Sequence, residues 1–335
     1  MNEPTTAAPS APPRISIVLL AYNQESMVRR AALACLEQEG GPYEIVFSDD
    51  ASTDDTFAAL EEVARTYRGP HRVVARRNAQ NVGIGEHYNE LMHATTGELI
   101  VTAAGDDVSL PQRVRRIAEA WEATGRRADL VASHVIDLDH DGRTHDVIRV
   151  DDLAPYRDVD AWGENRPYII GAGHAFTRRM MERFGPFRRD IAYEDQIMVF
   201  RAIATGGAVT VDEPLVLYRR GGTSARPAVF HSAEHLERWR DRQLRRELAE
   251  KHQLIADAEV AGCGDKVRQM LDRSLRRDHY VMMLRDAASR GERWATFRSA
   301  RYLPVGWRFK KLLHVLYPGA TARVKRSLAV FHRRR

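Results

Sequence analysis

The chain has 335 residues, and its 44% apolar and 29% charged content is typical of a globular protein. No apolar run approaches the roughly 18 residues that a membrane-spanning helix needs. Cys35 and Cys263 are too few for a disulfide framework or a cysteine metal cage, which predicts a cytoplasmic protein. Residues 1–13 are rich in Pro, Ala and Thr and lack the apolar core of a signal peptide, so we expect a disordered tail there.

The net charge of +5 is unevenly distributed. Residues 290–335 hold 13 of the 51 Lys and Arg residues but one of the 46 acidic residues. Aromatic side chains interleave with these basic residues, a pattern typical of segments that bind anionic membrane surfaces. An equally open alternative is that the aromatic side chains pack on the core or on a partner subunit. Nucleic acid is the least favoured partner, because no nucleic-acid-binding motif accompanies the charge.

The first half of the chain alternates strands with helices. Apolar, β-branched segments predict buried strands at 15–21, 43–50, 72–75 and 98–104. Helical spacing follows each of them, so we expect a mainly parallel α/β sheet. Ser52 is expected to cap the second helix, Pro111 to open the fourth, and a hairpin to turn at Asp141–Gly142.

The pattern changes near residue 225. Before it, we expect a short helix after the glycine-rich stretch at 171–173, a helix beginning near Glu194, and one or two strands at 208–220. After it, the pattern is helical. The sequence therefore predicts an α/β domain at 14–225 and a helical, basic region at 226–335.

Polar or acidic residues end three of the predicted strands: Tyr22 and Asn23, Asp49 and Asp50, and Asp106 and Asp107. Ligands of parallel α/β sheets bind at the carboxyl ends of the strands, so we expect these side chains to gather on one edge. Adjacent carboxylates repel unless a cation or hydrogen-bond donors lie between them, and their oxygens suit Mg²⁺ or Mn²⁺. The alternative for each acidic pair is a role at the start of a helix.

The motifs of several other enzyme classes are missing, including the glycine-rich dinucleotide fingerprint, the P-loop and the hydrolase nucleophile elbow. Instead, four segments occur in order within residues 14–225: SIVLLAYNQE, EIVFSDDASTDDT, NVGIGEHYNELMHATTGELIVTAAGDD and YEDQ. Together they resemble the family 2 inverting glycosyltransferases. The resemblance implies a GT-A fold, with a mixed, mainly parallel nucleotide-sugar-binding sheet flanked by helices and an α-helical C-terminal extension.

The resemblance implies roles for residues at the strand ends. The expected nucleotide-binding residues are Ala21, Tyr22, Asn23, Asp49, Asp50, Asn81, Gly83 and Asp106. Asp106 and Asp107 match the end of the family's acidic metal-binding motif, which implies a divalent cation, Mn²⁺ or Mg²⁺. Ala104 stands where the fuller motif has its first acid, so it stays open which of the two aspartates ligates the metal.

Two further segments match the family. Asp195 in YEDQ matches the catalytic aspartate, the base that deprotonates the acceptor hydroxyl. Glu194, Gly173 and His174 fall in the region that faces the donor sugar and the acceptor. The His174 side chain could contact a sugar hydroxyl or satisfy a hydrogen bond in the core.

The segment after the last predicted strand departs from the family. Many relatives carry a metal-ligating histidine there, whereas this sequence has Arg219, Arg220 and two glycines. The two arginines could neutralise a phosphate group or be solvated at the surface.

The predicted function is inverting transfer of a sugar from a nucleotide-sugar donor to a hydroxyl acceptor, in the synthesis of a surface polysaccharide or glycolipid. We expect a UDP-sugar donor, with a dTDP- or GDP-sugar as alternatives, and a glycan or lipid-linked acceptor. The expected location is cytoplasmic, with peripheral binding to the inner face of the membrane as an option. A sugar-phosphate nucleotidyltransferase and a non-catalytic nucleotide-sugar-binding or scaffold protein stay open as alternatives.

Overall fold

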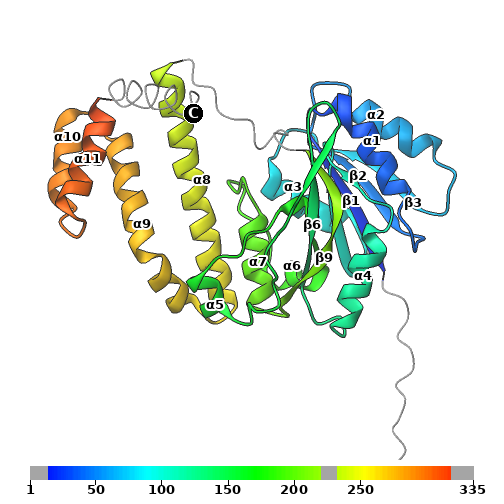
Figure 1. Ribbon diagram of the computed structural model, residues 1–335. Coiled ribbons are helices and arrows are strands. Elements are labelled where there is room, and N and C mark those ends of the chain that lie inside the picture. Colours follow the sequence, from blue (N-terminus) through cyan, green and yellow to red (C-terminus); the bar gives the residue numbers. More distant parts are fainter. Residues whose placement is uncertain (1–13, 220–231, 318–335) are drawn as a thin grey trace, which may run out of the picture. The chain divides into compact units, whose positions relative to one another are not determined.

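The computed structural model describes residues 14–219 and 232–317 (Figure 1). Within these ranges the chain divides into two compact units: residues 14–189 with 194–219, and residues 190–193 with 232–317. The tail expected at 1–13 and the boundary expected at 225 lie outside the described residues.

The first unit contains one mixed sheet with helices on both faces. Its strands are β1 (Ile15–Ala21), β2 (Glu44–Asp49), β3 (Arg72–Arg77), β4 (Leu99–Ala104), β5 (Val108–Ser109), β6 (Leu130–Leu138), β7 (Thr144–Ile148), β8 (Ala175–Thr177) and β9 (Ala208–Arg219). Its helices are α1 (Glu25–Leu36), α2 (Thr56–Thr66), α3 (Ile84–Ala94), α4 (Arg113–Ala123), α5 (Val159–Glu164), α6 (Arg178–Phe184) and α7 (Asp195–Ile203), with a 3₁₀ turn, η1, at Gly171–Gly173.

The described strands follow the order β3-β2-β1-β4-β8-β6-β9-β5, with β7 paired to β6. Strands β1 to β4 pair in parallel, and β8 runs antiparallel to both β4 and β6. The mixed, mainly parallel sheet that the sequence predicts is therefore confirmed.

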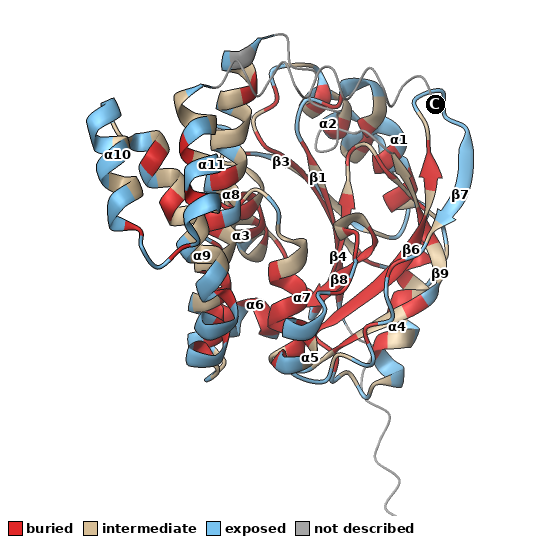
Figure 2. Cartoon of the chain, turned by 60° about the vertical axis from the view of Figure 1, so that its left-hand side comes forward, coloured by how far each residue is buried: buried red, intermediate tan, exposed pale blue. Residues whose placement is uncertain are grey.

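The hydrophobic core lies under the helices that follow the first strands. Alternate residues of β1, from Ile15 to Ala21, face a cluster that includes buried side chains of α1, α2 and α4. Those three helices lie on one face of the sheet, and α3, α6 and α7 lie on the other (Figure 1). Both faces are covered, so the central strands are buried along almost their whole length (Figure 2).

The structure corrects one helix start. α2 begins at Thr56, and the Ser52 side chain does not cap it. Ser52 instead donates its backbone N–H and its hydroxyl to the Asp49 carboxylate. The Ser52 side chain, which was expected to cap the helix, therefore stabilises the turn after β2. The hairpin between β6 and β7 turns at Asp141–Gly142 as expected, with Gly142 at a φ of 80°.

The second unit is helical. It contains α8 (Ala233–Val260), α9 (Gly264–Asp286), α10 (Arg290–Ser299) and α11 (Val305–Leu316). A small cluster that includes Tyr280, Leu284 and Leu312 joins α9 to α11, with the Tyr280 and Trp307 rings 5.7 Å apart. Among the helices of the described ranges, none is both long and apolar enough to cross a membrane.

Candidate functional site

The carboxyl ends of the first four strands meet at one edge of the sheet. In the register of the sheet, Asp49 pairs with Ala21 on one side and with Arg77 on the other. Leu20 pairs with Ala104 of β4. The loops after β1, β2, β3 and β4 therefore leave the sheet side by side. The residues that the sequence places at the ends of these strands lie at this edge.

Asp50 organises the loop after β3. Its buried carboxylate accepts hydrogen bonds from the side chain of Asn78 (2.8 Å) and from the backbone N–H groups of Val82 and Gly83 (3.0 Å each). Gly83 has a φ of 79°, a left-handed conformation that favours glycine. These bonds fix the backbone around Asn81, whose side chain is exposed at the same edge.

Asp49 lies deeper than its neighbour. Its side chain is fully buried, and it forms an ion pair with Arg77 (3.2 Å) in addition to its bonds with Ser52. The Asp49 carboxylate is thus engaged within the protein, where it holds the turn that leads to the Asp50 loop.

The loop after β1 presents a polar and an aromatic side chain. Ala21 is buried at the end of the strand, whereas Tyr22 is 39% exposed. Asn23 has a φ of 51°, and its side-chain oxygen accepts the backbone N–H of Thr53 at 2.8 Å. This bond ties the loop after β1 to the loop after β2.

Asp106 and Asp107 have different surroundings. Asp107 is buried and accepts the backbone N–H of Arg219 at 2.7 Å. Burial, and then the adjacent Asp106, raise the pKa of Asp107 to about 8. Asp106 is half-buried, and the Arg219 guanidinium bonds the backbone oxygens of Asp106 (3.2 Å) and Asp139 (2.8 Å). Arg219 therefore closes off one side of the acidic pair, while Arg220 lies outside the described residues.

The donor set of this pair fits a hard divalent cation, because it consists of carboxylate oxygens. Ala104 contributes no carboxylate, and in residues 14–219 and 232–317 no three His, Cys, Asp or Glu side chains gather as metal ligands. A cation held by two carboxylates would complete its coordination with water and substrate phosphate oxygens, as Mg²⁺ commonly does.

Asp195 begins α7 and packs directly against the η1 turn. A Cβ atom added to Gly171 would collide with the Asp195 carboxylate and would lie 3.0 Å from the Glu194 carboxylate, so any larger residue there would have to displace these side chains. The Tyr88 hydroxyl donates to the Glu194 carboxylate at 3.2 Å. Burial raises the pKa of Glu194, which favours its protonated form beside Asp195.

Tyr218 lies within reach of the charges of both acidic groups, and no motif in the sequence marks it. It follows the β9 residue that pairs with Val108, which puts it across from Asp107. Burial raises the pKa of Tyr218, and Asp107, Asp106 and Asp195 raise it further, so its ring lies within electrostatic range of all three. Its position at a strand end, the criterion used for the other residues, would have identified it.

His174 lies inside the protein. Its side chain is fully buried, and neither ring nitrogen has a hydrogen-bond partner among the described residues. Burial, and then the charge of Arg113, lower the pKa of His174 to about 3. The neighbouring Gly173 packs so closely on the backbone of Ser133 that a Cβ atom would lie 2.7 Å from its oxygen.

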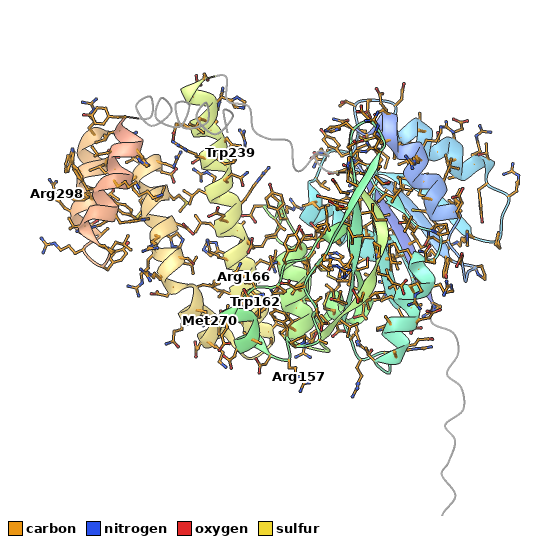
Figure 3. The ribbon with its side chains drawn as sticks, viewed as in Figure 1. Arg157, Trp162, Arg166, Trp239, Met270 and Arg298 are labelled. Carbon is orange, nitrogen blue, oxygen red and sulfur yellow. The ribbon has the colours of Figure 1, made fainter. Side chains whose placement is uncertain are left out.

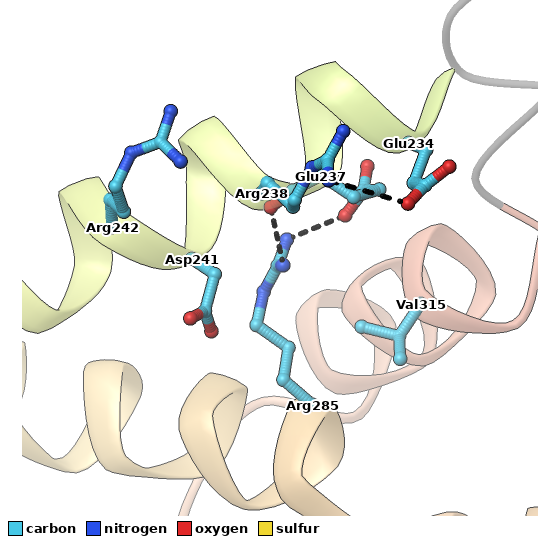
Figure 4. Close-up of a pocket in the computed structure, with 7 residues that line it drawn as sticks. All are labelled: Glu234, Glu237, Arg238, Asp241, Arg242, Arg285 and Val315. Atoms are coloured by element: carbon cyan, nitrogen blue, oxygen red, sulfur yellow. Dashed lines mark hydrogen bonds and ion pairs between the residues drawn. The ribbon is translucent and has the colours of Figure 1, made fainter. Parts of the chain in front are cut away.

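A cleft in the helical unit contains none of these residues. Figure 4 shows Arg285 of α9 reaching across it to Glu237 of α8, an ion pair of 2.8 Å. The cleft is lined by Glu234, Glu237, Arg238, Asp241, Arg242, Arg285 and Val315. Its charges are of both signs, and Glu234 pairs with Arg238 and Glu237 with Arg285, so it presents no uniform field to a ligand.

The sheet, its acidic edge and the sequence define the class of protein. Residues 16–185, just over half of the chain, match the family model described as glycosyl transferase family 2, and the chain belongs to that family. Membership sets aside the nucleotidyltransferase alternative.

Curated relatives match part of the chain. The succinoglycan biosynthesis protein ExoO of Rhizobium meliloti is 30% identical over 215 residues, which cover 60% of this chain and 58% of ExoO. The putative glycosyltransferase EpsE of Bacillus subtilis is 29% identical over 104 residues, which cover 31% of this chain and 37% of EpsE. The matched regions thus span less than two thirds of either relative.

Solved structures share the fold. The mannosyltransferase PcManGT from Pyrobaculum calidifontis, in complex with GDP-Man and Mn²⁺, has a TM-score of 0.52 at 17% identity, covering 95% of this chain and 91% of that chain. S. aureus TarS 1–349, in complex with UDP-GlcNAc, has a TM-score of 0.55 at 12% identity, covering 93% and 92%. The GT-A fold class predicted from the sequence is therefore confirmed.

Proposed function

We propose that this chain transfers a sugar from a nucleotide-sugar donor to a hydroxyl acceptor with inversion, and that Asp195 is the base. The observation that supports the proposal is that two acidic groups lie next to β4. The Asp195 carboxylate contacts the η1 turn, which packs on β4, and the Asp106–Asp107 pair follows the end of that strand. A base on one side and a leaving-group site on the other are what a displacement with inversion requires.

The acidic pair would hold the divalent cation, Mn²⁺ or Mg²⁺. When bound, such a cation supplies Lewis-acid stabilisation of the charge that develops on the diphosphate leaving group. Arg219 adds a fixed positive charge beside the pair through its bonds to the Asp106 and Asp139 backbone. Its guanidinium suits phosphate oxygens, which gives the segment without the histidine a function of its own.

The loops after β1, β2 and β3 would bind the nucleotide. Tyr22 and Asn23 are exposed where a base and a ribose would lie, and Asn81 and Gly83 belong to the loop fixed by Asp50. We expect a UDP-sugar, with dTDP- and GDP-sugars as alternatives. Of the two solved structures that share the fold, one is in complex with UDP-GlcNAc and the other with GDP-Man, which supports testing more than one base.

The test is nucleoside diphosphate release from a panel of UDP-, dTDP- and GDP-sugars with Mn²⁺, in the presence of alkyl glycosides as acceptor probes. We expect release with one class of donor, and a loss of about 10²-fold or more in Asp195→Asn. Asp212→Asn is the matched control, because its side chain is 86% exposed on β9 and should leave the rate unchanged. Chelation of the cation with EDTA should also abolish release.

The other outcomes identify the alternatives. Pyrophosphate as the product would contradict sugar transfer. Nucleotide binding without turnover of any donor, with water or with the probes, would favour the binding or scaffold protein.

We further propose that the acceptor is a glycan or a lipid-linked glycan of a surface polysaccharide, and that the protein works at the cytoplasmic face of a membrane. The likeness to ExoO, a succinoglycan biosynthesis protein, supports the acceptor class. The helical unit supports the location, through an apolar stripe on α11. We call this surface the α11 stripe; it consists of Val305 (64% exposed), Phe309 (42%), Leu313 (37%) and Tyr317 (52%).

The surroundings of the α11 stripe are basic. Trp294 of α10 is 39% exposed and lies 6.4 Å from the Phe309 ring. Arg298 points outward from α10 (Figure 3). The exposed basic side chains of this region are Arg290, Arg298, Arg301 and Lys310. An apolar stripe in a region with several exposed cations is complementary to an anionic lipid surface.

A further inference from the structure

Arg113 is a buried arginine that the proposed chemistry does not yet use. It is the first residue of α4, and only 1% of its surface is exposed. A guanidinium without solvent must find hydrogen-bond acceptors and charge partners within the protein. Burial lowers the pKa of Arg113 only to about 10, so it carries its charge at neutral pH.

The guanidinium of Arg113 joins three segments of the chain. One terminal nitrogen donates to the Ser109 hydroxyl of β5 at 2.8 Å. The other donates to the backbone oxygens of Thr102 in β4 (2.8 Å) and Ala172 in η1 (2.7 Å), with a longer contact to that of His174 (3.4 Å). A planar guanidinium places donors on two separate terminal nitrogens and so reaches acceptors on separate segments, whereas a lysine ammonium donates from a single atom.

Two of the segments that Arg113 joins adjoin the acidic groups. β4 leads directly into the Asp106–Asp107 pair. The η1 turn begins with Gly171, on which the Asp195 carboxylate leans. The distance between the leaving-group site and the base therefore depends on the position of the η1 turn. The Arg113 side chain fixes that position by binding carbonyl groups of both the turn and β4.

We propose that Arg113 is a positioning residue: it holds the 171–174 turn, and with it the Asp195 carboxylate, in place relative to the paired aspartates that end β4. The inference rests on the proposed function, since it concerns the base of that reaction. Arg113 touches no reacting atom, and its effect passes through the turn.

The chain offers a matched control in Arg178. It is the first residue of α6, and its guanidinium bonds the backbone oxygens of Gly97 (2.9 Å), Met92 (3.0 Å) and Thr95 (2.7 Å). This second arginine thus binds the same kind of carbonyl cradle at the amino end of β4, the edge opposite the acidic pair.

The experiment compares Arg113→Lys with Arg178→Lys in the full chain. Diphosphate release from the fastest donor gives kcat and KM, calorimetry with the nucleoside diphosphate and Mn²⁺ gives Kd, and thermal unfolding gives Tm. Both variants should lower Tm. Only Arg113→Lys should lower kcat, by about 10- to 100-fold, because a misplaced base loses rate at that scale. The Kd should stay within about threefold, since the nucleotide loops do not contact Arg113.

Equal effects of the two variants on kcat would overturn the inference and leave Arg113 a structural residue. If Arg113→Lys does not fold, Ser109→Ala removes a single acceptor of the guanidinium and should lower kcat by a few-fold at unchanged Kd; an unchanged kcat there would contradict the proposal. If the wild-type protein turns over no donor, the proposed function fails first. Crystal structures of the two variants then decide the geometry, because a Gly171 turn that keeps its position in Arg113→Lys would sink the inference.

Discussion

A methyl group added at Gly171 should lower the activity of the protein without unfolding it. The Asp195 carboxylate occupies the space that a Cβ atom would take. We expect Gly171→Ala to displace the base and lower diphosphate release by about 10²-fold. The control is Gly306→Ala in α11, where no atom lies within 4 Å of the added methyl group. Full activity of Gly171→Ala would mean that Asp195 does not need its position against the turn.

His174 should make the protein sensitive to acid. Its pKa falls from the ordinary 6.5 to about 3 in the folded protein, first because of burial and then because of the charge of Arg113. Below pH 6.5 the unfolded state binds a proton that the folded state excludes. The contribution of His174 to the free energy of unfolding is therefore fully present above about pH 6.5 and is lost as the pH falls toward 3. At pH 4.5 the loss from this residue should reach about 2–3 kcal/mol.

The measurement is urea unfolding of His174→Leu and of wild type at pH 7.5 and 4.5. The variant should lose less stability between the two pH values than wild type does. His93→Gln, which alters an exposed histidine of α3, should behave like wild type. If all three proteins lose the same stability between pH 7.5 and 4.5, other groups, such as the buried His87 with its pKa of about 4, account for the acid sensitivity.

At the scale of elements, Asp129 joins the start of β6 to the end of β8 and to the turn before β9. It precedes β6, and only 3% of its surface is exposed. Its carboxylate accepts hydrogen bonds of 2.6–2.8 Å from Thr177, Arg179, Thr205 and Gly206. We expect Asp129→Ala to lower the free energy of unfolding by about 3–5 kcal/mol, because it leaves the buried Thr177 hydroxyl and the donors of Thr205 and Gly206 without their acceptor.

The comparison for Asp129 is Asp212→Ala, measured by the same chemical denaturation. Asp212 pairs with His134 and Arg149, but its side chain is 86% exposed, so we expect a change below about 1 kcal/mol. A loss for Asp129→Ala no larger than that for Asp212→Ala would mean that solvent replaces the buried contacts.

The elements themselves were largely readable from the sequence. Apolar runs bounded by turn residues identified β1, β2 and β4 because a sheet covered on both faces needs continuous apolar strands. The start of α2 was wrong for a specific reason. The Ser52 hydroxyl could accept a backbone N–H at the start of a helix or donate to a nearby carboxylate, and only the folded chain shows that it donates to Asp49.

At the scale of the whole molecule, the uneven charge should act through the α11 stripe. We expect the protein to bind vesicles that contain phosphatidylglycerol, to bind phosphatidylcholine vesicles weakly, and to lose binding as salt screens the charge. The double variant Phe309→Ser and Leu313→Ser should weaken binding about tenfold or more. Met270→Ser, which changes an exposed apolar side chain of α9 (Figure 3), is the control.

Two results of the vesicle experiment would contradict membrane binding. One is equal binding of wild type and the double variant to anionic vesicles. The other is a concentration-dependent self-association that the double variant abolishes, since a second copy of the chain would then be what covers the stripe.

The sequence by itself determined the fold class, the family and the set of strand-end acids, because strand periodicity and the spacing of motifs are local properties of the chain. The tertiary structure decided which side chains meet. Only folding brings Arg113 to the carbonyl groups of the 171–174 turn, Tyr218 across from Asp107, and Asp195 against Gly171. Such contacts join residues tens of positions apart, and no local pattern encodes them, since they arise from strand order and register in the folded sheet.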